Sequence, residues 1–265
     1  MRPKSPTSIA LSALALWFAS NMMRTKTTWG LSGNALKLLA AVLMVIDHVG
    51  VIFFPMNMTW RYIGRLSMPI FAFLLAQGCK YTHNRWRYLL NLSACLIVCQ
   101  VGNYIGTGEH YICILGTFLA GALVLFALQD LKKALLEGKY PIAAAILLYM
   151  GLLLYGILRL NSIMEIDYGF WGCMLPVFAG LPFMPQGASA ALKKIDSKWV
   201  SLACFGVGLV ILSIDAQFDI QGYSLLALPL LALYSGRRGT RKLKYFFYLF
   251  YPIHLALLQG LYMIL

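Results

Sequence analysis

LKLLAAVLMVIDHVGVIFF, residues 36–54, decides the fold. The stretch is apolar and long enough for one helix to cross a bilayer, which takes about 20 residues. Asp47 and His48 lie side by side within it. Ionisable side chains inside a membrane helix are costly, and by default they mark a functional site. The stretch therefore predicts a membrane protein and also the place of its chemistry.

The rest of the chain repeats this apolar character. Of its 265 residues, 60% are hydrophobic and only 12% are charged, whereas a soluble domain carries about 25% charged residues. The sequence therefore predicts an all-α fold, a polytopic transmembrane helix bundle with about nine spans. The predicted spans are 36–54, 60–79, 88–106, 111–129, 141–158, 167–183, 198–214, 222–235 and 245–264.

The basic residues predict the orientation of these spans. Lysines and arginines gather in alternate connections, while the other connections carry acids such as Asp167, Asp215 and Asp219. The positive-inside rule places the basic connections in the cytoplasm and the C-terminus outside. The net charge of +13 is then a topology signal, so we expect no nucleic-acid partner, only the lipid bilayer. Typical members of the basic set are Arg24, Lys37, Lys80, Arg85, Lys132, Lys139, Lys193, Lys198, Arg238 and Lys244.

Residues 1–30 form a predicted N-terminal extension before a single integral membrane domain, residues 31–265. The apolar run 8–23 is short, and as a span it would place Arg2 and Lys4 outside. An interfacial helix or a dispensable extension fits better, with a tenth span as the alternative. The six cysteines form no C-x-x-C pair, so we expect neither a metal site nor a disulfide framework.

Four ionisable residues are predicted to share the middle-to-outer layer of the membrane. At about 1.5 Å per helical residue, Asp47 and His48 lie roughly 15–17 Å from the inner surface. His254 lies about 14 Å deep in the last helix, and Arg65 lies about 7 Å below the outer surface. We interpret these four residues as candidate catalytic residues.

Helix geometry separates the two adjacent residues. Successive side chains point about 100° apart, so Asp47 is poorly placed to orient His48. We expect Asp47 to pair with Arg65, which leaves His48 free to act. The alternative is a purely structural buried pair beside a hydrogen-bonded histidine.

Two prolines lie close to these residues. Pro69 removes the helical hydrogen bond to the carbonyl of Arg65, and Pro252 removes the one to Tyr248. We expect a kink at each position, with the freed carbonyl facing a polar cavity or another partner.

Three further pairs of residues are candidates for binding or for helix capping. Arg85 and Arg87 lie in a basic, aromatic loop and could bind the phosphates of an anionic cofactor, although most such loops are topology anchors. Asp167 and Asp219 each precede an apolar run and are predicted helix N-caps. Glu109 and His110 lie at the outer end of a helix and are predicted to mark where the helix starts. The alternative is a contact with a substrate on the outer side of the membrane.

Several motifs resemble those of the TraX family. The resemblance covers about residues 31–260 and begins with the motif that ends in Asp47-His48. The other matching segments are Arg61-Tyr-Ile-Gly-Arg65-Leu-Ser-Met-Pro69, Asp167-Tyr-Gly169 and Tyr248-Leu-Phe-Tyr-Pro-Ile-His254. The Tyr-Pro-x-His ending is also similar to that of the wider membrane acyltransferase superfamily.

The resemblance implies an acetyltransferase of the bacterial inner membrane that uses acetyl-CoA as co-substrate. It implies catalytic roles for His48, Asp47, Arg65 and His254. The founding member acetylates a pilin N-terminus during conjugation, whereas related membrane acyltransferases modify sugars. The acceptor is therefore left open between a peptide, a pilin and an envelope glycan.

In this interpretation His48 is the general base, and an acyl-histidine intermediate is the alternative mechanism. Arg65 holds Asp47 or stabilises the oxyanion, and His254 carries a second proton or binds the cofactor. Two other functions remain as alternatives. A proton-coupled transporter or exporter also uses intramembrane acids and histidines, and an assembly partner in a secretion or conjugation apparatus needs no catalysis.

Overall fold

The computed structural model describes residues 30–108, 111–239 and 243–264, and within these residues the chain is entirely helical apart from its connections. The predicted run 8–23, Glu109 and His110 lie outside the described residues. The long helices are α2 (Gly33–Phe53), α5 (Arg85–Thr107), α6 (Ile114–Leu136), α7 (Tyr140–Ile163), α10 (Lys198–Asp215) and α12 (Lys244–Ile264). The shorter ones are α3 (Thr59–Gly64), α4 (Ser67–Tyr81), α8 (Gly169–Gly180), α9 (Ala190–Ile195), the 3₁₀ helix η1 (Ile220–Leu226) and α11 (Ala227–Ala232).

Six of these helices are long and apolar enough to cross a membrane, and they are the six long helices named above. The all-α prediction is confirmed, but the count of about nine spans is not. Each of the other three predicted spans contains shorter helices. Residues 60–79 divide into α3 and α4, residues 167–183 hold the 12-residue α8, and residues 222–235 hold most of η1 and all of α11.

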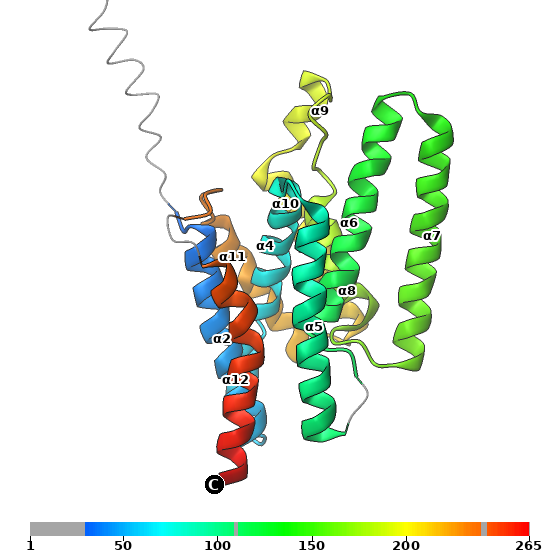
Figure 1. The fold of residues 1–265 in the computed structure, drawn as a ribbon. Coiled ribbons are helices and arrows are strands. Elements are labelled where there is room, and N and C mark those ends of the chain that lie inside the picture. The colour runs from blue at the N-terminus through cyan, green and yellow to red at the C-terminus, as the bar shows by residue number, and fades with distance from the viewer. Residues whose placement is uncertain (1–29, 109–110, 240–242, 265) are drawn as a thin grey trace, which may run out of the picture.

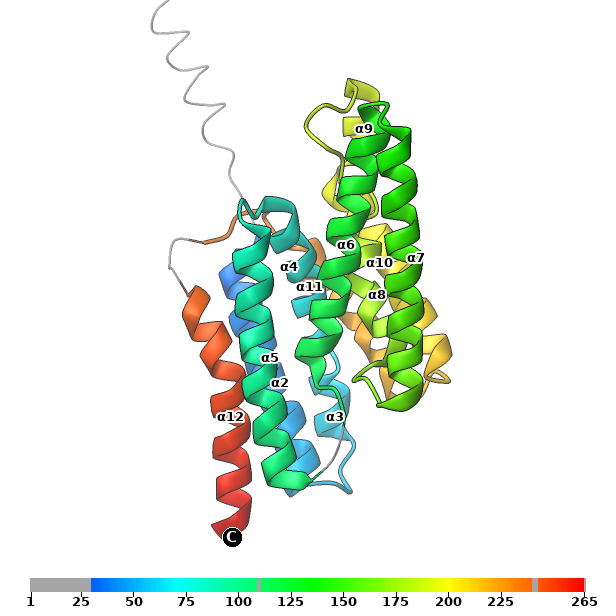
Figure 2. The ribbon, with the colours of Figure 1, turned by 45° about the vertical axis from the view of Figure 1, so that its right-hand side comes forward.

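The helices form one bundle, with α12 beside α2 and α5 at one edge and α7 at the opposite edge (Figures 1 and 2). The short helix α8 packs among α4, α6 and α10, in the interior of the bundle. Gly121 on α6 permits this packing, because a Cβ there would lie 2.5 Å from the carbonyl oxygen of Cys173 on α8. The α6–α7 turn and α9 lie at one end of the bundle, and the C-terminus lies at the other (Figure 1).

We name the two ends by their charges. The basic end holds Lys80, Lys139 and Lys198, and the acidic end holds Asp215 and Asp219. This segregation follows the alternation seen in the sequence. Which end faces the cytoplasm stays a prediction.

The prolines have different effects in the two helices. The chain breaks between α3 and α4 at Arg65 and Leu66, so Pro69 lies in the first turn of α4, where it is tolerated. Pro252, by contrast, lies inside the continuous helix α12. The carbonyl of Tyr248 accepts a hydrogen bond from the Cys95 thiol at 3.0 Å. The freed carbonyl has therefore found a partner, as predicted.

Helix caps are provided by short polar side chains. The hydroxyl of Ser32 accepts from the backbone N–H of Ala35 at the start of α2, and the Asn84 side chain accepts from that of Arg87 at the start of α5. These bonds satisfy backbone donors that a helix start leaves unpaired.

In the α6–α7 turn, the Lys139 ammonium lies 2.7 Å from the Glu137 carboxylate. This contact holds the pKa of Glu137 below the usual range.

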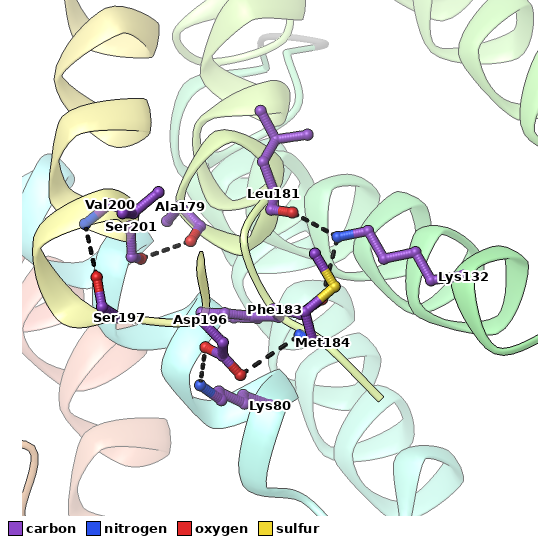
Figure 3. Close-up of polar contacts among 10 residues, drawn as sticks. All are labelled: Lys80, Lys132, Ala179, Leu181, Phe183, Met184, Asp196, Ser197, Val200 and Ser201. Atoms are coloured by element: carbon purple, nitrogen blue, oxygen red, sulfur yellow. Dashed lines mark hydrogen bonds and ion pairs between the residues drawn. The ribbon is translucent and has the colours of Figure 1, made fainter. Parts of the chain in front are cut away.

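Lysines at the basic end also fasten the connection that carries α9. Lys80 of α4 binds Asp196, whose second oxygen accepts from the backbone N–H of Met184 (Figure 3). Lys132 of α6 donates to the carbonyls of Leu181 and Phe183. These two lysines were expected only to mark the cytoplasmic side, but they also tie the 181–196 connection to the bundle.

Candidate functional site

Two histidines from opposite ends of the sequence meet inside the bundle. His48 lies on α2 and His254 on α12, and their ring centroids are 5.1 Å apart at an interplanar angle of 70°. His254 is only 6% exposed, and its ring stacks on Phe250 with a centroid distance of 4.9 Å. The two predicted catalytic histidines are thus direct neighbours.

Backbone carbonyls fix the tautomers of both rings. Nδ1 of His48 lies 2.8 Å from the carbonyl oxygen of Met44, and Nδ1 of His254 lies 2.9 Å from that of Phe250. A carbonyl can only accept, so each Nδ1 carries a hydrogen. Nε2 of His254 then has its lone pair 3.5 Å from Nδ1 of His48. The Nε2 lone pair of His48 is left to receive a proton.

Asp47 pairs with a different arginine from the one expected. Its Oδ1 lies 3.6 Å from Nε of Arg61, and the side chains are 16% and 25% exposed. The predicted Asp47–Arg65 pair is therefore wrong. Arg61 lies within α3 and Arg65, four residues later, is the C-cap of that helix, so the sequence could not separate them.

Gly64 brings α3 onto Asp47. A Cβ at position 64 would lie 2.3 Å from the Cβ of Asp47 and 2.5 Å from its Oδ1. Such distances are too short for any side chain. A glycine is therefore needed for α3 to carry Arg61 against the carboxylate.

Arg65 turns toward the connection between α7 and α8. Its guanidinium carbon lies 5.4 Å from the centroid of the Tyr168 ring, a cation–π contact. The charge of Arg65 also acts on the half-buried carboxylate of Asp167. The helix α8 begins at Gly169 with Tyr168 as its N-cap. Asp167 is therefore not the helix cap that was predicted, and its side chain belongs to the polar site.

A cavity of about 940 Å³ joins these groups to the basic end of the bundle. Near its middle and acidic side it is lined by Asp47, His48, Arg61, Arg65 and Asp167, and the cavity extends along α2 and α4. At the basic end its lining includes Lys37, His83 and Arg238. His254 is not part of the lining, but it contacts three residues that are: His48, Phe250 and Tyr251.

The two arginines predicted to bind a cofactor lie elsewhere. Arg85 donates to Asp130 at 2.6 Å and to Gln129 at 3.2 Å, and it stacks on Phe126. Arg87 is exposed, and neither arginine lines the cavity. The basic groups that do line it, Lys37 and Arg238, have no carboxylate partner among the described residues.

A comparison with protein families identifies the family of this chain. The family model described as TraX protein matches residues 32–262, which is most of the chain. The chain belongs to the TraX family. With its six apolar helices, it is an integral membrane member of that family.

A curated relative of this TraX chain is the probable fimbrial assembly protein FimC, serogroup H1, of Dichelobacter nodosus. The two are 26% identical over 245 residues, which cover 86% of this chain and 94% of the relative. No solved structure matches the chain.

The TraX motifs quoted from the sequence converge on the cavity. Asp47 and His48, then Arg61, Gly64 and Arg65, and also Asp167 and Tyr168 line it. Sequence reasoning missed Arg61 and Asp167 as members of the site. Gly64, three residues after Arg61, is the one sequence feature consistent with a close helix contact here, but the contact itself is seen only in the structure.

Proposed function

We propose that this protein is a membrane-embedded acetyltransferase that moves an acetyl group from acetyl-CoA to an amine or hydroxyl acceptor. One observation carries the proposal. His48 lines a cavity of about 940 Å³ with its Nδ1 held by a backbone carbonyl and faced by His254. A neutral histidine with a fixed tautomer and a free Nε2 is arranged as a general base.

In this mechanism Nε2 of His48 removes the proton from the acceptor as its nitrogen or oxygen attacks the thioester carbonyl. The bond from that atom to the acetyl carbon forms, the carbon–sulfur bond breaks, and the proton passes to the leaving thiolate. The products are the acetylated acceptor and coenzyme A. Positive charge on the His48 ring is stabilised by the Met44 carbonyl, which accepts from Nδ1–H, and by the Nε2 lone pair of His254, which lies 3.5 Å from that nitrogen.

The arginines act on the other reacting groups. Arg65 lies in the cavity lining with an Nε that has no hydrogen-bond partner among the described residues. A donor of this kind suits the oxyanion that develops on the thioester carbonyl. Arg61 instead neutralises Asp47, so the carboxylate does not compete for the proton of the acceptor.

The anionic end of acetyl-CoA fits the basic end of the cavity. Lys37 and Arg238 line it without carboxylate partners, and His83 stands beside them in the same lining. Phosphate groups favour such clusters. We therefore move the proposed cofactor contact from Arg85 and Arg87 to Lys37, His83 and Arg238. By the positive-inside rule this end faces the cytoplasm, where acetyl-CoA is found.

The relative named as a fimbrial assembly protein favours a pilin or another exported protein as acceptor over an envelope glycan. Pilus biogenesis is accordingly the process in which we place this chain. Mass spectrometry of pilin peptides and envelope glycans, with and without the gene, tests this choice. An acetyl group that disappears from a glycan and not from a peptide would reverse it.

The enzymatic proposal is tested with purified protein in proteoliposomes and radiolabelled acetyl-CoA. We expect thioester cleavage that depends on the protein and increases when an amine acceptor is added. Proton flux across the vesicle membrane with no consumption of acetyl-CoA would contradict the enzymatic proposal. That result is expected of a proton-coupled transporter.

A further inference from the structure

A second cavity, of about 280 Å³, adjoins the first at the acidic end. Arg65, Asp167 and Tyr168 line both cavities and form the boundary between them. Its other polar lining comes from the end of α10 and the start of η1: Asp215, Asp219 and Gln221.

Two acids of this second cavity, Asp215 and Asp219, form neither an ion pair nor a side-chain capping bond among the described residues. Asp215 is the last residue of α10, where the helix dipole disfavours a carboxylate. Asp219 stands at the N-cap of η1, as its sequence position predicted, but its side chain makes no capping bond. No described lysine, arginine or histidine forms an ion pair with either carboxylate.

Gln221 supplies an independent sign of a ligand. Its side chain is 5% exposed and lines the second cavity, yet its Nε2 has no hydrogen-bond partner among the described residues. A buried amide donor without a partner is costly, and such groups call for an explanation such as an absent ligand. The donor requires an oxygen that can accept.

The backbone around this cavity is also strained. Tyr168, Gln217 and Phe218 have φ values of 62°, 56° and 53°, and they are the non-glycine residues of the described chain with positive φ. Gln217 and Phe218 connect Asp215 to Asp219. Strained backbone of this kind persists where the surrounding structure holds it, often at functional sites.

We propose that the second cavity binds the acceptor as a primary ammonium ion, with Asp215 and Asp219 as counter-charges and Nε2 of Gln221 donating to a neighbouring oxygen of the acceptor. The acceptor waits there behind Arg65 and Tyr168 as the ammonium ion, loses one proton to water, and reaches His48 as the neutral amine that can attack. The role as a waiting site rests on the proposed acetyltransferase function, whereas the binding itself does not.

A cysteine reporter tests the binding without any need for catalysis. Ala216 lines the second cavity and is exposed, so Ala216→Cys places a thiol there at small structural cost. The rate of its modification is measured with a cationic trimethylammonium methanethiosulfonate and with an anionic sulfonate analogue. The full-length chain without this substitution gives the background of its native cysteines.

Relative to a small free thiol in solution, we expect the ratio of the cationic rate to the anionic rate to be raised at least about tenfold, because the carboxylates concentrate cations in the cavity. Glycinamide, which has an ammonium and a carbonyl oxygen, should protect the thiol at lower concentration than glycolamide, which has a hydroxyl in place of the ammonium. The double substitution Asp215→Asn with Asp219→Asn should remove both preferences. Gln221→Met should weaken protection by both compounds.

Asp130→Asn is the matched control, because it removes one acid at the basic end. It should leave both preferences unchanged. A rate ratio no higher than that of the free thiol, or equal protection by glycinamide and glycolamide, would overturn the proposal. Ile220→Cys, also in the cavity lining, provides a second reporter if Ala216→Cys lowers expression. If the protein shows charge-selective protection but no transferase activity, the enzymatic proposal is refuted and the proposal of a binding site is retained.

Discussion

Nε2 of His254 lies 3.5 Å from Nδ1 of His48, although 206 positions separate the two residues in the chain. His254 is outside the cavity lining, and His48 is its one polar side-chain partner among the described residues. His254 was predicted to carry a second proton or to bind the cofactor. Its position outside the lining instead favours a role that acts on His48. We infer that His254 positions His48 and stabilises its protonated ring.

A His254→Phe variant tests this positioning role. It keeps an aromatic ring against Phe250 but removes the Nε2 acceptor. We expect kcat to fall by about ten- to a hundredfold, with little change in KM for acetyl-CoA, because His48 keeps its carbonyl partner Met44. His83→Ala, at the basic end, should instead raise KM for acetyl-CoA. An unchanged kcat in His254→Phe would show that the contact is only structural.

The Asp47–Arg61 pair is tested by a double-mutant cycle on thermal stability in detergent. Asp47→Asn and Arg61→Gln are each expected to destabilise the protein by about 1–3 kcal/mol. This range lies below the cost of breaking a fully buried pair, because both side chains are partly exposed. The coupling energy should be clearly favourable for Asp47 with Arg61 and near zero for Asp47 with Arg65. A larger coupling with Arg65 would restore the pair expected from the sequence.

Gly64→Ala should break the close contact between α3 and Asp47. The added Cβ meets the Asp47 side chain and backbone at 2.3–2.7 Å, so α3 must move and carry Arg61 away. We expect reduced stability, by about 1–3 kcal/mol as for other overpacking changes, and loss of transferase activity. Gly151→Ala on α7 is the control, because nothing lies within 4 Å of that position. Equal behaviour of the two variants would contradict the packing argument.

Lys80→Met should loosen the 181–196 connection at the basic end, since it leaves Asp196 without its ammonium partner. Limited proteolysis of the purified protein should then cut within residues 185–197 several times faster than in the unaltered protein. Lys194→Met, on the exposed side of α9, should leave the cleavage rate unchanged. If both variants are cut alike, the Lys80–Asp196 contact does not hold the connection.

Local features of this fold could be predicted from the sequence, because they depend on composition and on the chain's own geometry. Apolar runs located every described helix except α9, and the missing N–H of Pro69 explains the break at Arg65. The depth argument placed His48 and His254 in the same layer, and in the structure their rings are in contact. These predictions required only distances along a helix.

Contacts between helices could not be predicted in the same way. Whether Arg61 or Arg65 faces Asp47 depends on the rotation of α3, which the break before α4 changes. The sequence predicted a span over residues 167–183, but α8 ends at Gly180. Residues 181–183 leave the helix, and the carbonyls of Leu181 and Phe183 accept from Lys132. The basic residues of the cavity, Lys37 and Arg238, come from segments 200 positions apart.

The central claim is that His48 is the general base of an acetyl transfer. It is tested most directly by acetyl-CoA cleavage and acetyl transfer in proteoliposomes, compared between the unaltered protein and His48→Ala. We expect a loss of at least about a hundredfold in kcat, with acetyl-CoA binding retained. Full activity of His48→Ala would contradict the account.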